Sequence, residues 1–202
     1  MLRILFALFI FIANAAQAEQ TLLVFGDSLS AGYGIRQDQA WPALLDLRLK
    51  TQHYSYAVAN ASISGETSGG GAARFGAALA RFKPSIVIIE LGANDGLRGL
   101  QLTQLRDNLE RMIRMSRAAG AQVLLVGIEL PPNYGSDYTR GFAAVYTDLQ
   151  RKHRVALLPF LFAGFATERE AFQADGLHPT AATQARLLDN IWRVLLPLLR
   201  KS

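Results

Sequence analysis

The sequence contains no cysteine, and this absence excludes several kinds of chemistry at once. Without thiols the chain cannot form disulfides, use a cysteine nucleophile or build a thiolate metal site. Its fold must therefore be held by an apolar core, and 50% of its residues are hydrophobic. If the protein forms a covalent intermediate, serine is the natural nucleophile.

Histidine is also scarce, with only three residues in the chain. They are not spaced as metal ligands are, so neither a zinc enzyme nor any other metal site is expected. His53 and His153 stand among polar or basic residues and are predicted to lie at the surface. Only His178 has a carboxylate close by, that of Asp175, in a loop bounded by glycine and proline.

Two common loop motifs are missing as well. The glycine-rich stretch 65–71 lacks the Gly-Lys-Ser/Thr ending of a P-loop and the spacing of a dinucleotide fingerprint, so no cofactor is expected and Gly69–Gly71 is predicted to be a short mobile turn. A Gly-x-Ser-x-Gly elbow is absent around Ser28, which disfavours the α/β-hydrolase fold. Basic residues outnumber acidic ones by 21 to 16 but are scattered, so no nucleic-acid partner is expected.

The N-terminus has the pattern of a secretory signal. A basic start is followed by an apolar run over 4–13, and Ala16 and Ala18 place small residues where a signal peptidase cleaves. The apolar run is about half of the roughly 20 residues that a spanning helix needs, so no stable membrane anchor is expected. We predict a signal peptide over 1–18, cleavage after Ala18, and one periplasmic or secreted domain over 19–202. Nothing in the sequence demands more than a monomer.

Short apolar runs alternate with helical patterns along the rest of the chain. The runs are typical of strands buried on both faces of a parallel sheet, and they lie at 22–25, 54–59, 85–91, 122–128 and 155–158. Helical spacing is clearest from about Thr103 to Gly120. Right-handed crossovers place helices on both faces of such a sheet. The pattern therefore predicts an α/β fold, a three-layer α/β/α sandwich around five parallel strands, and leaves the strand order open.

A candidate nucleophile follows the first apolar run, in Gly26-Asp27-Ser28-Leu29. A serine at the carboxyl end of a buried strand is held by rigid backbone where a substrate can reach it. Its hydroxyl needs a base, which His178 can supply, and a carboxylate to orient that base, which Asp175 can supply. Asp27 is predicted to hold the turn.

Two further segments follow apolar runs and are expected on the same rim as Ser28. The first contains Gly65, whose backbone N–H can approach a substrate closely, and the second contains Asn94, whose side-chain amide is a neutral donor. Both could donate hydrogen bonds to the negative charge that develops on a carbonyl oxygen.

Taken in order, the blocks around Ser28, Gly65, Asn94 and His178 resemble the four sequence blocks of the SGNH (GDSL) hydrolase family. The likeness covers nearly the whole chain after the N-terminal segment. It implies a flavodoxin-like strand order and a serine esterase that hydrolyses acyl esters and thioesters, lysophospholipids among them, through an acyl-enzyme. It also implies a triad of Ser28, Asp175 and His178, with an oxyanion hole made by Ser28, Gly65 and Asn94.

Other interpretations stay open at this point. A carbohydrate O-acetylesterase would use the same chemistry on a smaller acyl group, and an exported module could bind a small anion without turnover. The loop over 130–138 follows the fourth strand and should lie near the rim, so we predict that Asn133 and Tyr134 contact substrate. Aromatic residues such as Phe160 and Phe162 are interpreted as core.

Overall fold

The computed structural model describes residues 19–201 and contains a single parallel sheet of five strands. The strand order is β2-β1-β3-β4-β5, so the chain starts near the middle of the sheet and builds outward on either side. This is the flavodoxin-like order that the family resemblance implies. The strands are β1 (Gln20–Gly26), β2 (Tyr56–Asn60), β3 (Ile86–Glu90), β4 (Gln122–Val126) and β5 (Ala156–Leu158).

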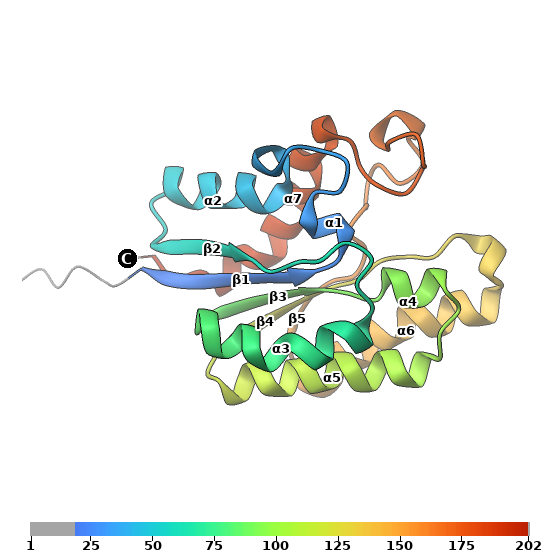
Figure 1. Cartoon of the computed structure of the whole chain (residues 1–202), viewed down its shortest axis with the longest axis horizontal. Coiled ribbons are helices and arrows are strands. Elements are labelled where there is room, and N and C mark those ends of the chain that lie inside the picture. The colour runs from blue at the N-terminus through green and yellow to red at the C-terminus, as the bar shows by residue number, and fades with distance from the viewer. Residues whose placement is uncertain (1–18, 202) are drawn as a thin grey trace, which may run out of the picture.

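Helices cover both faces of the sheet, as Figure 1 shows. One face carries α1 (Ser28–Ala31), α2 (Trp41–Thr51) and α7 (Gln184–Leu195). The other face carries α3 (Ser68–Phe82), α4 (Ala93–Leu97), α5 (Leu102–Ala118) and α6 (Ser136–His153). Short 3₁₀ turns complete the fold: η1 (Gln37–Gln39), η2 (Pro132–Tyr134), η3 (Arg169–Ala171), η4 (Ala181–Thr183) and η5 (Leu196–Leu198). The predicted three-layer α/β/α sandwich is confirmed.

The core forms because the strands are apolar on both sides and each helix has one apolar face. All five residues of β3 are buried. On α5 the buried positions include Leu105, Leu109, Met112 and Ile113, the spacing that the sequence predicts. The chain turns away from the helix at Gly120, which has a φ of +80°, a conformation that side chains disfavour. The periodicity of the sequence therefore predicts which face of α5 is buried.

The triple glycine differs from its prediction. Gly69, Gly70 and Gly71 form the first turn of α3 instead of a mobile turn. Thr67 starts the helix by accepting a hydrogen bond from Gly70 N on its Oγ1 at 3.3 Å. Gly71 is buried, and a methyl group there would lie 2.5 Å from Leu91 Cδ1, so this glycine lets α3 pack closely on the sheet.

All five strands run in the same direction, so their carboxyl ends share one edge of the sheet. Gly26 at the end of β1 is the register partner of Glu90 at the end of β3. The segments that follow β1, β2 and β3 consequently meet on one rim. None of the helices described over 19–201 has the length and apolar character needed to span a bilayer. The predicted signal peptide, 1–18, lies outside the described residues.

Candidate active site

Ser28 lies at the tight turn between the end of β1 and the start of α1. Asp27 is fully buried and caps α1, accepting a hydrogen bond from Leu29 N on Oδ1 at 3.0 Å. At Gly26 an added Cβ would lie 2.7 Å from Glu90 Oε2 and 2.8 Å from the Glu90 carbonyl oxygen, so only glycine fits. This close packing fixes the backbone immediately before Ser28, the first residue of α1.

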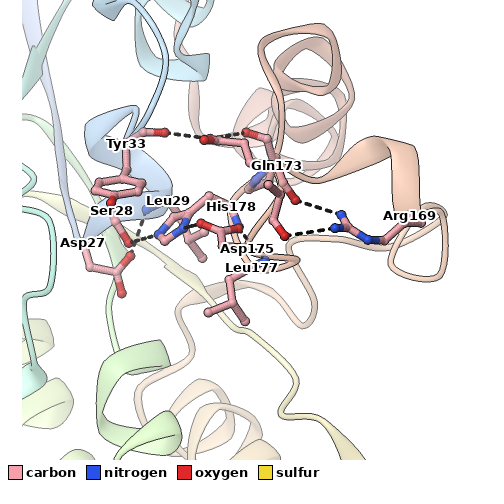
Figure 2. A network of polar contacts seen from close by, with 11 residues as sticks. Asp27, Ser28, Leu29, Tyr33, Arg169, Gln173, Asp175, Leu177 and His178 are labelled. Atoms are coloured by element: carbon pink, nitrogen blue, oxygen red, sulfur yellow. Dashed lines mark hydrogen bonds and ion pairs between the residues drawn. The ribbon is translucent and has the colours of Figure 1, made fainter.

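The histidine and its carboxylate come from the loop between η3 and η4, at the other end of the chain. Asp175 Oδ1 accepts hydrogen bonds from Leu177 N at 2.9 Å and His178 N at 3.0 Å. Its Oδ2 lies 2.7 Å from His178 Nδ1, and His178 Nε2 lies 2.8 Å from Ser28 Oγ. The structure thus brings together the three residues predicted from sequence, as Figure 2 shows.

The carboxylate is suited to orient the imidazole. The Leu177 backbone N–H, followed by the His178 side chain, lowers the pKa of Asp175 to about 2. Asp175 is therefore ionised at neutral pH and acts as a hydrogen-bond acceptor only. An acceptor at Nδ1 requires that nitrogen to carry a proton, which leaves Nε2 of the neutral ring as the acceptor facing Ser28 Oγ.

The two predicted oxyanion donors also reach this rim. Asn94 lies in α4, and its Nδ2 donates a hydrogen bond to Asp27 Oδ2 at 3.1 Å. Gly65 has a φ of +77°, and its carbonyl oxygen accepts a hydrogen bond from Arg98 Nη2 at 3.1 Å. Both residues line the same cavity as Ser28.

Two buried carboxyl groups beneath the site have shifted pKa values. Burial raises the pKa of Asp27 to about 6, although the hydrogen bonds from Leu29 N and Asn94 lower it. Burial, and next the charge of Asp27, raise the pKa of Glu90 well above its usual range. Glu90 Oε2 accepts a hydrogen bond from Ser30 Oγ at 2.7 Å. The sequence predicts that Asp27 holds the turn, but it predicts neither the bond from Asn94 to Asp27 nor a role for Glu90. A single carboxylate at the end of the apolar run 85–91 is the signal that could have found it.

A cavity of about 700 Å³ opens beside Ser28. Its polar end holds Ser28, Gly65, Asn94 and His178, while the remaining wall is mostly apolar. The apolar lining includes Leu29, Leu97, Ile128, Leu130, Phe160, Phe162 and Phe172. Phe160 and Phe162, interpreted from sequence as core, are only partly buried and form part of this wall. Periodicity cannot separate a core position from a cavity wall, because both are apolar.

Asn133 and Tyr134, the predicted substrate contacts, lie in the loop that reaches the cavity. Pro131 and Pro132 line the cavity from this loop, whereas Asn133 and Tyr134 do not. Tyr134 donates its hydroxyl to the Leu97 carbonyl oxygen at 3.1 Å. The loop does lie at the rim, as predicted, but other residues face inward.

The other two histidines lie away from the site. His53 is exposed, as predicted. His153 is not a plain surface residue, because its side chain is 13% exposed and its Nε2 lies 3.0 Å from Glu110 Oε1. Over residues 19–201 no group of three or more His, Asp and Glu residues is placed to hold a metal ion.

Comparison with known proteins identifies the family. The model of the GDSL-like lipase/acylhydrolase family matches residues 24–186. The chain is 53% identical to esterase TesA of Pseudomonas aeruginosa over 90% of each protein. It is 41% identical to the Escherichia coli protein named thioesterase 1/protease 1/lysophospholipase L1, over 96% of this chain and 91% of that protein. The protein is therefore a hydrolase of ester bonds and belongs to the GDSL-like lipase/acylhydrolase family.

Solved structures agree with this assignment. The crystal structure of TesA superposes with a TM-score of 0.87 and covers 89% of this chain and 100% of that chain. A psychrotrophic esterase EstA from Pseudoalteromonas, solved with monoethylphosphonate as inhibitor, has 37% identity and a TM-score of 0.85 over 89% of this chain and 98% of that one. The fold class and the family resemblance drawn from sequence are both confirmed.

Proposed function

We propose that the protein is a serine esterase that hydrolyses acyl esters and thioesters through an acyl-enzyme on Ser28. The observation that carries this proposal is the continuous chain of short contacts from Ser28 Oγ through His178 to Asp175, at the polar end of an apolar cavity. A serine hydroxyl, a base and a carboxylate in this arrangement are the parts that acyl transfer needs.

In the first half of the reaction, Ser28 Oγ attacks the carbonyl carbon and its proton passes to His178 Nε2. The carbonyl π electrons move to oxygen, and this oxyanion accepts hydrogen bonds from the N–H groups of Ser28 and Gly65 and from the Asn94 amide. The tetrahedral intermediate then collapses, and the alcohol or thiol leaves with the proton from His178. Asp175, ionised because of its low pKa, stabilises the imidazolium while it exists.

In the second half, water attacks the acyl-Ser28 carbonyl while His178 accepts its proton. Collapse releases the carboxylic acid and returns the proton to Ser28 Oγ. These steps use side chains, backbone N–H groups and water alone, so they require no cofactor or metal.

Asp27 supports this chemistry by fixing the direction of the Asn94 amide. An ionised carboxylate can only accept hydrogen bonds, so the bond to Asp27 Oδ2 requires the NH₂ end of Asn94 to face it. The second N–H of the same nitrogen is then available to the oxyanion, and the Asn94 carbonyl oxygen is kept from approaching that negative charge. Asp27 therefore orients a donor without contacting substrate.

The cavity favours acyl chains over acetyl groups. A two-carbon acyl group would occupy a small part of about 700 Å³, whereas a longer chain would remove the leucine and phenylalanine side chains from water. Lysophospholipids combine one such chain with a polar head, and the Escherichia coli relative includes lysophospholipase in its name. We accordingly favour acyl-chain substrates over acetylated carbohydrates.

The proposed location is the periplasm or the medium, because residues 1–18 have the pattern of a cleavable signal. Export would also make envelope esters more accessible than cytoplasmic acyl thioesters. We propose a monomer, since each proposed catalytic group comes from a single chain.

The test is a chain-length profile of the purified mature protein on nitrophenyl acetate, butanoate, octanoate and dodecanoate. We expect kcat/KM to rise from acetate to octanoate, and we expect release of fatty acid from lysophosphatidylcholine. Highest kcat/KM on acetate, together with deacetylation of acetylated sugars, would instead support the O-acetylesterase. Ser28→Ala serves as the control in every assay.

A further inference from the structure

The two parts of the proposed triad come from separate segments, which raises the question of what sets the distance between them. Ser28 follows β1, whereas Asp175 and His178 share a loop that begins after η3. The bonds of Asp175 to Leu177 N and His178 order that loop internally. They do not determine how far the imidazole lies from Ser28, and a displacement of about 1 Å in an active site can cost about 100-fold in rate.

Gln173 links the two segments. Its Nε2 donates hydrogen bonds to the Tyr33 carbonyl oxygen at 2.8 Å and to the Pro179 carbonyl oxygen at 3.2 Å. Tyr33 lies five residues after Ser28, and Pro179 directly follows His178. The Gln173 backbone N–H also donates to the His178 carbonyl oxygen at 2.8 Å. One half-buried side chain therefore joins the segment after the nucleophile to the residue next to the base.

Arg169 holds Gln173 from the other side of the loop. Its Nη1 donates to the Gln173 carbonyl oxygen at 2.8 Å, and its Nη2 donates to the Ala174 carbonyl oxygen at 3.0 Å. Figure 2 shows this chain of contacts from Arg169 through Gln173 to Tyr33. The link is thus anchored at both of its ends.

Tyr33 and Gly34, in the segment after Ser28, pack against His178 and Gln173. Gly34 has a φ of +74°, and a Cβ there would collide with the Gln173 amide. The Tyr33 ring lies against the His178 imidazole, with centroids 4.5 Å apart and planes at 37°. Tyr33 is 52% exposed, so its ring contributes little to the core and is placed instead over the base.

We propose that Gln173 and Tyr33 are positioning residues that hold the His178 imidazole within hydrogen-bond reach of Ser28 Oγ. This inference rests on the proposed function, which assigns Ser28 and His178 as nucleophile and base. Gln173 fixes the separation of the two segments, and the Tyr33 ring limits tilting of the imidazole. Gln173 does not line the cavity, and Tyr33 lines it beside His178, so both are assigned to the placement of the imidazole.

The test compares Gln173→Met with Gln122→Met. Methionine has a similar length but no N–H donor, so Gln173→Met removes both carbonyl contacts while filling the same space. Gln122 donates its Nε2 to the Leu198 carbonyl oxygen at 3.1 Å, far from the site, and provides the matched control. We expect Gln173→Met to lower kcat by about 10- to 100-fold with KM within about twofold, and Gln122→Met to leave kcat unchanged. Equal kcat values for the two variants would overturn the proposal.

A second measurement separates positioning from general loosening of the fold. Labelling by a fluorophosphonate, which needs an activated Ser28, is timed with and without Gln173→Met in wild type and in His178→Ala. If Gln173 acts through His178, the substitution slows labelling in wild type and leaves the slow labelling of His178→Ala unchanged. Equal slowing in both backgrounds would overturn the inference while leaving the triad intact.

The Tyr33 ring is tested in the same labelling assay. Tyr33→Phe keeps the ring and should label at the wild-type rate, whereas Tyr33→Ala should label more slowly; equal rates for the two would remove the ring from the proposal. If His178→Ala labels as fast as wild type, the triad assignment itself fails, and the positioning proposal fails with it.

Discussion

Asp27 offers the sharpest test of the oxyanion hole, because its two carboxylate oxygens have separate partners. Oδ1 accepts from Leu29 N and caps α1, while Oδ2 accepts from Asn94 Nδ2. In Asp27→Ser the hydroxyl can still cap the helix, since serine is a favoured N-cap residue. It is too short to reach Asn94. This substitution therefore releases the amide while keeping the turn.

The magnitude follows from the bond that is lost. A hydrogen bond to a charged group contributes about 1.5–3 kcal/mol, so releasing the Asn94 amide should lower kcat by about 10- to 100-fold. Asn94→Ala removes the donor itself and should lower kcat by about 10²–10³-fold. KM should change little in both variants, because the contact strengthens mainly in the transition state.

The double variant Asp27→Ser/Asn94→Ala shows whether Asp27 orients the Asn94 amide or only supports the turn. If Asp27 acts through Asn94, Asp27→Ser should cost almost nothing in the Asn94→Ala background, and the coupling energy should match the whole effect of the single substitution. The assay is kcat and KM on a soluble nitrophenyl ester for wild type, both single variants and the double variant. Multiplicative losses would refute the orientation of Asn94 by Asp27.

Asp27→Ser should lower activity, but it should improve stability relative to wild type as the pH rises. Burial raises the Asp27 pKa from 3.8 to about 6, so the folded protein holds this proton more tightly than the unfolded chain. The resulting stabilisation is present below about pH 4 and is lost as pH rises through about 6, a change of about 3 kcal/mol. Relative to wild type, Asp27→Ser should therefore gain stability between pH 4 and pH 8. Urea unfolding at pH 4 and pH 8 measures the difference in unfolding free energy between Asp27→Ser and wild type. The same difference at both pH values would contradict the effect assigned to the buried charge.

Three further results are expected. Gly26→Ala should lower both Tm and kcat, because the added Cβ would lie 2.7 Å from Glu90 Oε2, two residues before Ser28. Thermal melting and kinetics measure this, and a variant with wild-type Tm and kcat would contradict the packing argument. Ala166→Trp should reduce hydrolysis of dodecanoate more than butanoate, since Ala166 is exposed and lines the cavity, while exposed Ala163 outside it provides the matched Ala163→Trp control. Mass spectrometry of the exported protein should find the chain beginning after Ala18, and retention of the full-length chain in the membrane would refute cleavage.

Much of this fold is predictable because strands and helices leave periodic patterns. The apolar runs locate all five strands to within a few residues, and the face of α5 is correctly predicted. The strand order is not contained in periodicity, since it depends on long-range pairing, and it came from the family resemblance. The prediction of a mobile turn at Gly69–Gly71 is wrong for a related reason. Glycine favours turns locally, but the packing of α3 against Leu91 requires a small residue at Gly71 within the helix.

The residues of the site that belong to a sequence motif can be predicted. Those whose role depends on the direction of a side chain cannot. Ser28, Asp175 and His178 meet as the sequence indicates. The residues that line the cavity cannot be chosen from sequence, because the conformation of the loop decides whether Pro131 or Tyr134 does so. The contacts of Gln173 cannot be predicted in this way, because a side chain that joins two backbone carbonyls leaves no pattern along the chain.

Covalent labelling tests most directly whether Ser28 is the nucleophile that becomes acylated. The mature protein is treated with a fluorophosphonate, digested, and its peptides are analysed by mass spectrometry. We expect a single adduct on Ser28 that appears as esterase activity disappears and that is absent from Ser28→Ala. An adduct on another residue, or Ser28→Ala protein that still hydrolyses esters at the wild-type rate, would contradict it.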